Sequence, residues 1–198
     1  MAGKRNRAAT RAKVLAAAIE VFAERGYAGA SIESIAEASG MTIGALYSNF
    51  TGKRELFLSA LREAVGRSEE EPGTRRFDPK TDLPADRLVS DGYAYMNSIE
   101  QDPARFRLLL WSLLQAQTDA DIREVVVEVL REQRDVQASI LKAMAKQEDL
   151  ILSPKDGATL LNSMAIGFTA QRMIDPRKVT RAEGRRILES VVEALPVG

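Results

Sequence analysis

Residues 31–57 read SIESIAEASGMTIGALYSNFTGKRELF, and this stretch decides the fold. Ser31 can cap a short helix that Gly40 ends, and Thr42 can open a second helix that reaches residue 50. Two short helices joined by a tight glycine turn have the dimensions of a helix-turn-helix, here over about 31–50. Apolar residues recur along both helices at helical spacing and predict their buried faces: Ile32, Ile35, Ala36, Leu46 and Phe50.

The same spacing continues on both sides of this stretch. An earlier apolar series predicts a helix that ends at Gly26, and a later one predicts a helix over 53–67. Five more series follow, over about 84–100, after Pro103, over 122–144, after Pro154 and after Thr180. Since no strand pattern of convincing length appears, we expect an all-α fold of about nine helices.

Composition excludes several chemistries. The 198 residues include no cysteine and no histidine, which removes thiolate chemistry and the commonest general base and metal ligand. We therefore expect no metal and no cofactor. No apolar run approaches a membrane span, and the N-terminus lacks a signal-peptide pattern, so a cytoplasmic protein without membrane contact is expected.

Charge is unevenly distributed along the chain. Residues 1–67 hold ten basic and six acidic residues, a net charge of +4, and the remainder carries −4. Residues 68–83 replace periodic apolar positions with acids, prolines and a glycine, as in a connecting loop. We therefore predict domains over 1–67 and 68–198. The first thirteen residues contain five cations and no acid, which fits either an arm that neutralises phosphates or a solvated tail: Lys4, Arg5, Arg7, Arg11 and Lys13.

The sequence resembles the TetR family of bacterial transcriptional regulators. The matching positions lie on separate helices at fixed spacing: Ile35-Ala36, Gly40, Thr42, Gly44, Leu46-Tyr47, Phe50, Lys53 and Leu56-Phe57. The likeness is strong over residues 10–67. Beyond them it rests mainly on the predicted architecture, together with one weaker local likeness, GFTAQRMIDP at residues 167–176. It implies an N-terminal three-helix DNA-binding unit, joined through a fourth helix to a larger domain that binds an effector and dimerises.

The third predicted helix would face DNA. If Leu46 and Phe50 point inward, the small residues Gly44, Ala45 and Ser48 point outward, so the helix backbone could approach base edges in the major groove. Ile43 lies at the edge of the apolar stripe, where a core role and contact with a thymine methyl are both open; the resemblance favours the contact. No Arg or Lys points outward from this helix, so apolar contacts, the basic arm in a minor groove or DNA shape would carry specificity.

Phosphate contacts are expected around this helix. The resemblance assigns the Tyr47 hydroxyl to a phosphate, although its ring could also fill the helix junction. Asn49 could read adenine or bind phosphate, and phosphate is favoured. Ser31 can cap its helix and also bind an anion there. Lys53 is a cation at the start of a helix, where the helix dipole disfavours it unless an anion such as a phosphate lies nearby. The full set of predicted DNA-binding residues is Ser31, Thr42, Ile43, Gly44, Ala45, Tyr47, Ser48, Asn49 and Lys53.

The second domain is expected to bind a small, largely apolar effector and to form a homodimer through its last two helices. Aromatic, methionine and amide residues could line the effector pocket: Tyr93, Met96, Phe106, Trp111, Gln115, Met144, Asn162, Phe168 and Gln171. By the resemblance, the chain is a repressor that releases a palindromic operator on effector binding; activation stays open. The alternatives are a helical-bundle enzyme using carboxylates such as Glu124 and Glu128, or an interaction module without DNA binding.

Overall fold

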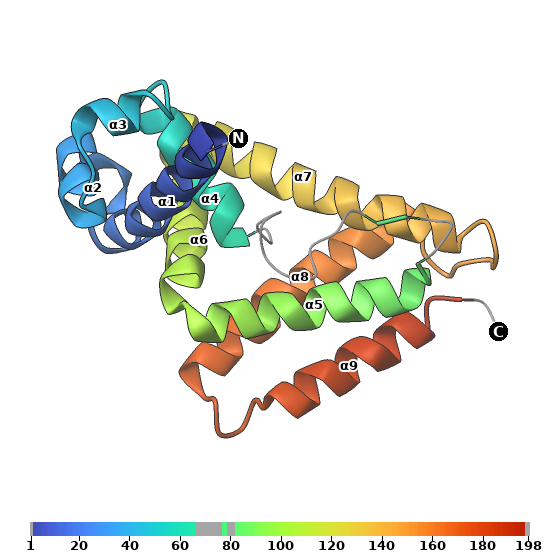
Figure 1. Ribbon diagram of the computed structural model, residues 1–198. Helices are drawn as coiled ribbons and strands as arrows, with labels where there is room; N and C mark the ends of the chain where they lie inside the picture. The colour runs from blue at the N-terminus through green and yellow to red at the C-terminus, as the bar shows by residue number, and fades with distance from the viewer. Residues whose placement is uncertain (1, 66–76, 79–81, 197–198) are drawn as a thin grey trace. The chain divides into compact units, whose positions relative to one another are not determined.

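The computed structural model describes residues 2–65, 77–78 and 82–196, which form nine helices and no strand (Figure 1). The all-α prediction is confirmed. The helices are α1 (Ala2–Gly29), α2 (Ile32–Ser39), α3 (Ile43–Tyr47), α4 (Lys53–Val65), α5 (Pro84–Gln101), α6 (Pro103–Gln115), α7 (Ala120–Met144), α8 (Pro154–Ile174) and α9 (Arg181–Glu193). The predicted connecting loop over 68–83 lies largely outside the described residues, as does the predicted end of α4 near residue 67. Among the described helices, none combines the length and apolarity needed to cross a bilayer.

The chain forms two compact units. Unit 1 comprises Met1–Arg67 and Asp102–Val129, and unit 2 comprises Ser68–Gln101 and Leu130–Gly198. Unit 1 therefore adds α6 and the first part of α7 to the residues that the sequence assigns to the first domain. The reason is packing: α6 lies against α1 and α4 and buries an almost continuous apolar face there.

An aromatic cluster forms the centre of unit 1. The Phe22 and Phe57 rings meet edge to face with their centroids 5.1 Å apart, and Trp111 meets Phe57 edge to face at 6.1 Å. Phe22 and Phe57 are buried, and Phe106 on α6 is buried in the same unit. These contacts bind α6 to the helices that carry the helix-turn-helix.

Gly26 changes the course of α1. Its φ of 68° and ψ of 176° lie in a region that essentially only glycine adopts. A Cβ added here would also lie 2.5 Å from Trp111 Cζ2, so the indole occupies the space that a side chain would need. The predicted helix end at Gly26 is thus a break in helical geometry, and the chain continues helically to Gly29.

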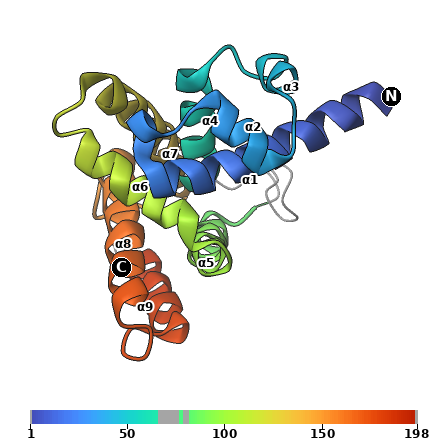
Figure 2. The same cartoon turned by 90° about the vertical axis from the view of Figure 1, so that its left-hand side faces the viewer.

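Unit 2 is built from α5, α8, α9 and the second part of α7. Its core includes Leu88, Ile140, Leu161, Leu188 and Val192. The helix α5 packs against both α8 and α9, and a turn joins α8 to α9 at one end of the unit (Figure 2). The glycines at positions 92 and 184 let α5, α8 and α9 approach closely, because a Cβ at either would meet a Leu188 or Phe168 side-chain atom within 2.5 Å.

Candidate nucleic-acid interface and ligand pocket

The two helices predicted as a helix-turn-helix are present in unit 1. Ser31 caps α2 in a reciprocal capping box with Ser34, and Gly40 ends α2 in the left-handed conformation at φ 61°. The Thr42 hydroxyl caps α3 by accepting from Ala45 N at 3.1 Å. The helix α3 has five residues and ends at Tyr47, whereas the sequence predicts helix to residue 50.

One face of α3 is left uncovered by unit 1. Leu46 and Phe50 are 1% and 3% exposed and point inward as predicted, while Ile43 and Tyr47 are 42% and 56% exposed. Gly44 and Ser48 are exposed and Ala45 is half-buried beside them. Ile43 therefore does not belong to the core, and the Tyr47 ring does not fill the helix junction. This outward face presents small, apolar and hydroxyl-bearing side chains together.

The side-chain amide of Asn49 makes hydrogen bonds within the protein. Its Nδ2 donates to Ala45 O at 2.8 Å and to Ser48 Oγ at 3.2 Å, and its Oδ1 accepts from Arg7 Nε at 3.4 Å. A phosphate contact through this side chain, as the sequence predicts, requires these hydrogen bonds to rearrange.

Two arginines of α1 hold the C-terminal end of α3. Arg7 Nη2 donates to Ser48 O at 2.7 Å. Arg11 donates to Asn49 O at 3.5 Å and to Ser59 Oγ at 3.3 Å, and its guanidinium lies 4.5 Å from the centroid of the Phe50 ring. Cations at a helix C-terminus are favourable because unpaired carbonyls gather there. The spacing of the two arginines, one helical turn, was the sequence signal for this shared role.

The basic arm is itself helical, since α1 begins at Ala2. A helix is about 10–12 Å in diameter with its side chains, and the minor groove of B-DNA is about 6 Å wide. The predicted insertion of this arm into a minor groove is therefore incompatible with the conformation seen here.

Lys53 and Ser31 have partners within the protein. Lys53 Nζ lies 4.5 Å from the centroid of the Tyr27 ring, and the negative face of the ring attracts the ammonium group. The sequence predicts a phosphate as the partner of the same cation. At the start of α2, backbone hydrogen bonding and the Ser31 hydroxyl hold the pKa of Glu33 below its ordinary value. A phosphate at this helix end would thus meet the Glu33 carboxylate.

The carboxylates considered for an enzyme are engaged in ion pairs. Glu124 Oε2 accepts from Arg54 Nη2 at 2.9 Å, and Glu128 Oε1 accepts from Arg62 Nη2 at 2.5 Å. Across the described part of the chain, no three or more acidic side chains converge as a metal site requires. These glutamates fasten α7 to α4.

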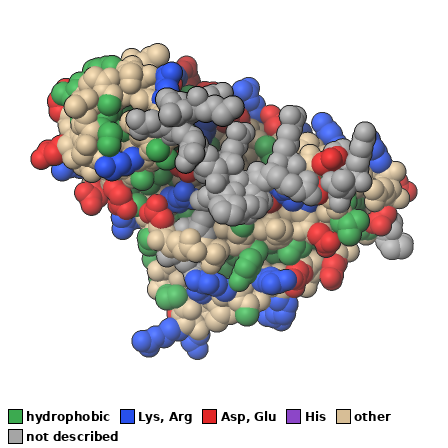
Figure 3. Space-filling view, in the orientation of Figure 1, with side chains coloured by type: hydrophobic (Ala, Val, Ile, Leu, Met, Phe, Trp, Pro, Cys, Tyr) green, Lys and Arg blue, Asp and Glu red, His purple; other side chains and the backbone are tan. Residues whose placement is uncertain are grey.

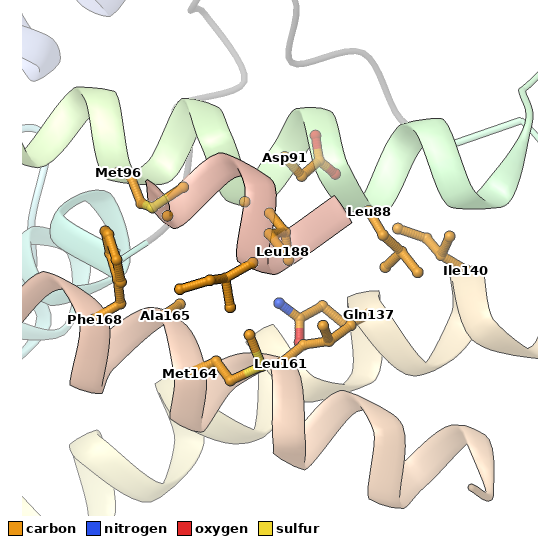
Figure 4. Close-up of a pocket in the computed structure, with 13 residues that line it drawn as sticks. Leu88, Asp91, Met96, Gln137, Ile140, Leu161, Met164, Ala165, Phe168 and Leu188 are labelled. Atoms are coloured by element: carbon orange, nitrogen blue, oxygen red, sulfur yellow. The ribbon is translucent and has the colours of Figure 1, made fainter. Parts of the chain in front are cut away.

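A cavity of about 60 Å³ lies inside unit 2, between α5, α7, α8 and α9 (Figure 4). Of the thirteen residues that line it, eleven are apolar and two, Asp91 and Gln137, carry polar side chains. Such a lining suits a mainly apolar ligand.

The structure brings part of the predicted pocket together. Met96 and Phe168 line the cavity, and Asn162 Nδ2 donates to the lining residue Gln137 at 2.6 Å. The other six predicted residues lie elsewhere. Met144 is buried in the unit 2 core, Tyr93 lies under Arg185 along a separate groove, Gln171 is exposed, and Phe106, Trp111 and Gln115 belong to unit 1 because α6 packs there.

Sequence reasoning missed Gln137, Leu188 and the two glycines of the wall, Gly92 and Gly184. The glycines have no side chain to signal a pocket, and Leu188 reads as an ordinary core position. Gln137 was detectable only as a polar residue one turn from buried Ile140 on α7.

Two family models match the chain. The model described as bacterial regulatory proteins, tetR family, matches residues 14–60, and the model described as BetI-type transcriptional repressor, C-terminal, matches residues 84–196. The first covers the helix-turn-helix and its supporting helices, and the second covers more than half of the chain.

Individual relatives are also regulators. The transcriptional activator FasR of Mycolicibacterium smegmatis is 34% identical over 99 residues, 50% of this chain and 44% of that protein. The transcriptional repressor AcnR of Corynebacterium efficiens is 39% identical over 61 residues, 31% of this chain and 32% of that protein. The matched stretch spans less than half the length of each of these relatives. The names of the family and of these relatives describe regulators and not enzymes.

Solved structures share the fold along nearly the whole chain. A TetR-family regulator from Rhodococcus sp. superposes with a TM-score of 0.73 at 19% identity, covering 95% of this chain and 98% of that one. The regulator FadR of Bacillus subtilis, solved in complex with stearoyl-CoA, superposes with a TM-score of 0.65 at 21% identity, covering 94% and 97%. At these identities the likeness establishes the fold alone.

Proposed function

The chain belongs to the TetR family of bacterial regulatory proteins, and we propose that it is a DNA-binding transcriptional regulator that reads base edges with α3. The observation that carries this proposal is the uncovered face of α3, where Ile43 is 42% exposed and Tyr47 56% exposed. Unit 1 buries the other face of the same short helix and holds its end with two arginines, so the exposed face is both free and fixed in place.

Each outward residue has a role in this proposal. Gly44 has no side chain and lets the backbone approach the bases, and Ile43 contacts a thymine methyl. Tyr47 donates its hydroxyl to a phosphate, and Ser48, Thr42 and Ala45 lie along the same groove. The remaining phosphate contacts are made by Ser31, Asn49 and Lys53, each of which must share its side chain with a partner within the protein.

A homodimer with a palindromic operator completes the DNA-binding unit. Leu160, Ile174 and Ile187 are exposed apolar residues of α8 and α9 and support self-association of this face. The first half of α9 carries Arg181 and Arg186 and the second half carries Glu193, so antiparallel packing of two copies would bring opposite charges together. Basic side chains gather at the α8–α9 turn (Figure 3). Binding of both subunits to successive major grooves requires two copies of α3 about 34–36 Å apart, one turn of DNA.

We propose that the protein is a repressor, and that a small, largely apolar effector occupies the cavity of unit 2 and lowers its affinity for DNA. The apolar lining supports this, and FadR of Bacillus subtilis, which shares the fold, was solved with stearoyl-CoA, a ligand whose acyl chain is apolar. Coupling of this kind is worth about 1–3 kcal/mol, or about 5- to 150-fold in DNA affinity, and requires the effector to bind the DNA-free state more tightly.

The test is selection of DNA from a random pool by the full chain, followed by anisotropy titrations on the recovered site. We expect a two-fold symmetric site and a steep loss of affinity with added salt. Recovery of no enriched sequence, or affinity independent of salt, would reject DNA binding and favour the interaction module.

A further inference from the structure

We propose that Gln137 is the specificity-determining residue of the unit 2 cavity and that its amide nitrogen binds an oxygen of a neutral, otherwise apolar effector. The inference rests on the effector site proposed above and adds the class of molecule that it accepts. The molecules in question carry a hydrogen-bond acceptor such as a ketone, ester or amide carbonyl.

A chain of two hydrogen bonds fixes the orientation of the Gln137 amide. Asn162 Nδ2 donates to the backbone carbonyl of Ala158 at 3.1 Å, and since a carbonyl only accepts, Asn162 must turn its nitrogen to that side. The same nitrogen donates to Gln137 Oε1 at 2.6 Å. The oxygen of Gln137 is therefore committed to Asn162, and its nitrogen must face the other way.

The Gln137 nitrogen points into the middle of the cavity, toward Leu188 and Ala165 (Figure 4). Within the described ranges, no protein acceptor hydrogen-bonds to this nitrogen. A donor enclosed by apolar side chains gains a hydrogen bond when a ligand brings an acceptor, and a ligand without one leaves the donor unpaired.

The second polar side chain of the cavity does not compete for this role. Asp91 Oδ2 accepts from Arg87 Nε at 2.7 Å, in an ion pair whose side chains are 25% and 16% exposed. Asp91 also points away from Gln137 (Figure 4). Since none of the described residues that line the cavity is a cation, an anionic ligand group would be left unpaired there, and a neutral oxygen is favoured.

The cavity must widen around its ligand. Its volume of about 60 Å³ is well below the about 300–1,000 Å³ typical of ligand pockets. Met96 and Met164 are unbranched and adaptable, so their thioethers can move aside for a small molecule. Small probes therefore suit the first experiment.

The experiment compares acetophenone with α-methylstyrene, which has the same shape but a methylene group in place of the carbonyl oxygen. Binding to the full chain is followed through the methionine methyl NMR signals of Met96 and Met164. We expect acetophenone to bind about 3- to 10-fold more tightly, the ratio that one neutral hydrogen bond supplies.

Two variants test the role of the amide. Gln137→Leu removes the donor at similar size and should abolish or reverse the preference for acetophenone, because its carbonyl would then lose water without gaining a hydrogen bond. Asn162→Asp places acceptors beside Gln137, which should turn its oxygen toward the cavity and abolish the preference for acetophenone. Gln171→Leu is the matched control, because that exposed amide on α8 donates to Gly167 O away from the cavity, and the preference should persist.

Three results would overturn the inference: equal binding of both probes to the wild type, no shift of either methyl signal with either probe, or a preference that survives Gln137→Leu. The readout does not involve DNA. A chain that binds an operator but shows no preference for the ketone refutes this inference alone, whereas a ketone preference without any DNA binding refutes the proposed regulator.

Discussion

Replacing Arg11 with methionine should loosen the end of α3 and weaken DNA binding without removing a DNA contact. Methionine keeps an unbranched side chain but loses the guanidinium that binds Asn49, Ser59 and Phe50. Isolated helices shorter than about 12–15 residues are marginal in water, so five-residue α3 depends on such contacts.

The magnitude follows from the individual contacts of Arg11. Its position 4.5 Å from the Phe50 ring centroid is worth about 0.5–1 kcal/mol for a partly exposed cation. The two hydrogen bonds, at 3.3 and 3.5 Å, are long and together add about 0.5–1 kcal/mol. The sum of about 1–2 kcal/mol should raise the population of locally opened α3 about 5- to 30-fold.

Hydrogen exchange of the Asn49 and Phe50 amides measures this opening, because both amides donate to Leu46 O, at 3.0 and 2.9 Å. We expect both to exchange about 5- to 30-fold faster in Arg11→Met, with an equal or smaller loss of operator affinity. Arg25→Met is the control, since it removes the same charge from an exposed position of α1 and should leave exchange unchanged.

The salt dependence of binding separates a positioning role from a phosphate contact. A residue that only positions α3 leaves the slope of log affinity against log salt unchanged, whereas a lost phosphate contact reduces it by about 0.9. Unchanged exchange in Arg11→Met together with a reduced slope would refute the reasoning and assign Arg11 to the DNA backbone.

Three further changes test other parts of the structure. Tyr47→Phe removes only an exposed hydroxyl, so operator affinity should fall about 3- to 10-fold with an unaltered melting temperature, and unchanged affinity would remove its phosphate role. Gly26→Ala should lower the free energy of unfolding, measured with urea, by about 2–5 kcal/mol, because of backbone strain and the clash with Trp111. Adding Trp111→Leu should recover the part of this loss that is due to the clash, and a loss below about 1 kcal/mol would contradict both causes. Glu55→Gln should lose about 0.5–1 kcal/mol at pH 7, since hydrogen bonds from the Thr51 backbone and hydroxyl hold the pKa of Glu55 below its ordinary 4.5. That contribution is present above pH 4.5 and is lost as the pH falls through the lowered pKa, so the stabilities of the two proteins should converge at acid pH, and a constant difference would contradict the assignment.

Local signals in the sequence predicted most of the fold. The caps Thr42, Asp102, Ser153 and Thr180 each accept from a backbone N–H two or three residues ahead, as their residue types and positions indicate. Helical periodicity also separated buried Leu46 from the outward residues of the same helix. These interactions connect near neighbours along the chain, so the sequence contains both partners side by side.

Interactions between distant residues were beyond this reasoning. Arg7 and Asn49 are 42 residues apart, and nothing near Asn49 indicates that its amide meets an arginine instead of a phosphate. An indole on an apolar helix needs a partner, which predicts a pocket position for Trp111, but the indole packs on Gly26, 85 positions earlier. Periodicity shows which face of a helix is buried and leaves open which neighbour covers it.

The shortness of α3 limits the number of operator base pairs that this protein can recognise by direct contact. Five residues rise about 7.5 Å, and successive base pairs are about 3.4 Å apart, so the helix spans only about two or three base pairs. Two copies would specify about four to six positions, a pattern that arises by chance about once in 250 to 4,000 base pairs, whereas a genome offers about a million or more competing sites. Singling out one promoter therefore demands information from outside the helix: the distance between half-sites, and the ease with which the intervening duplex bends.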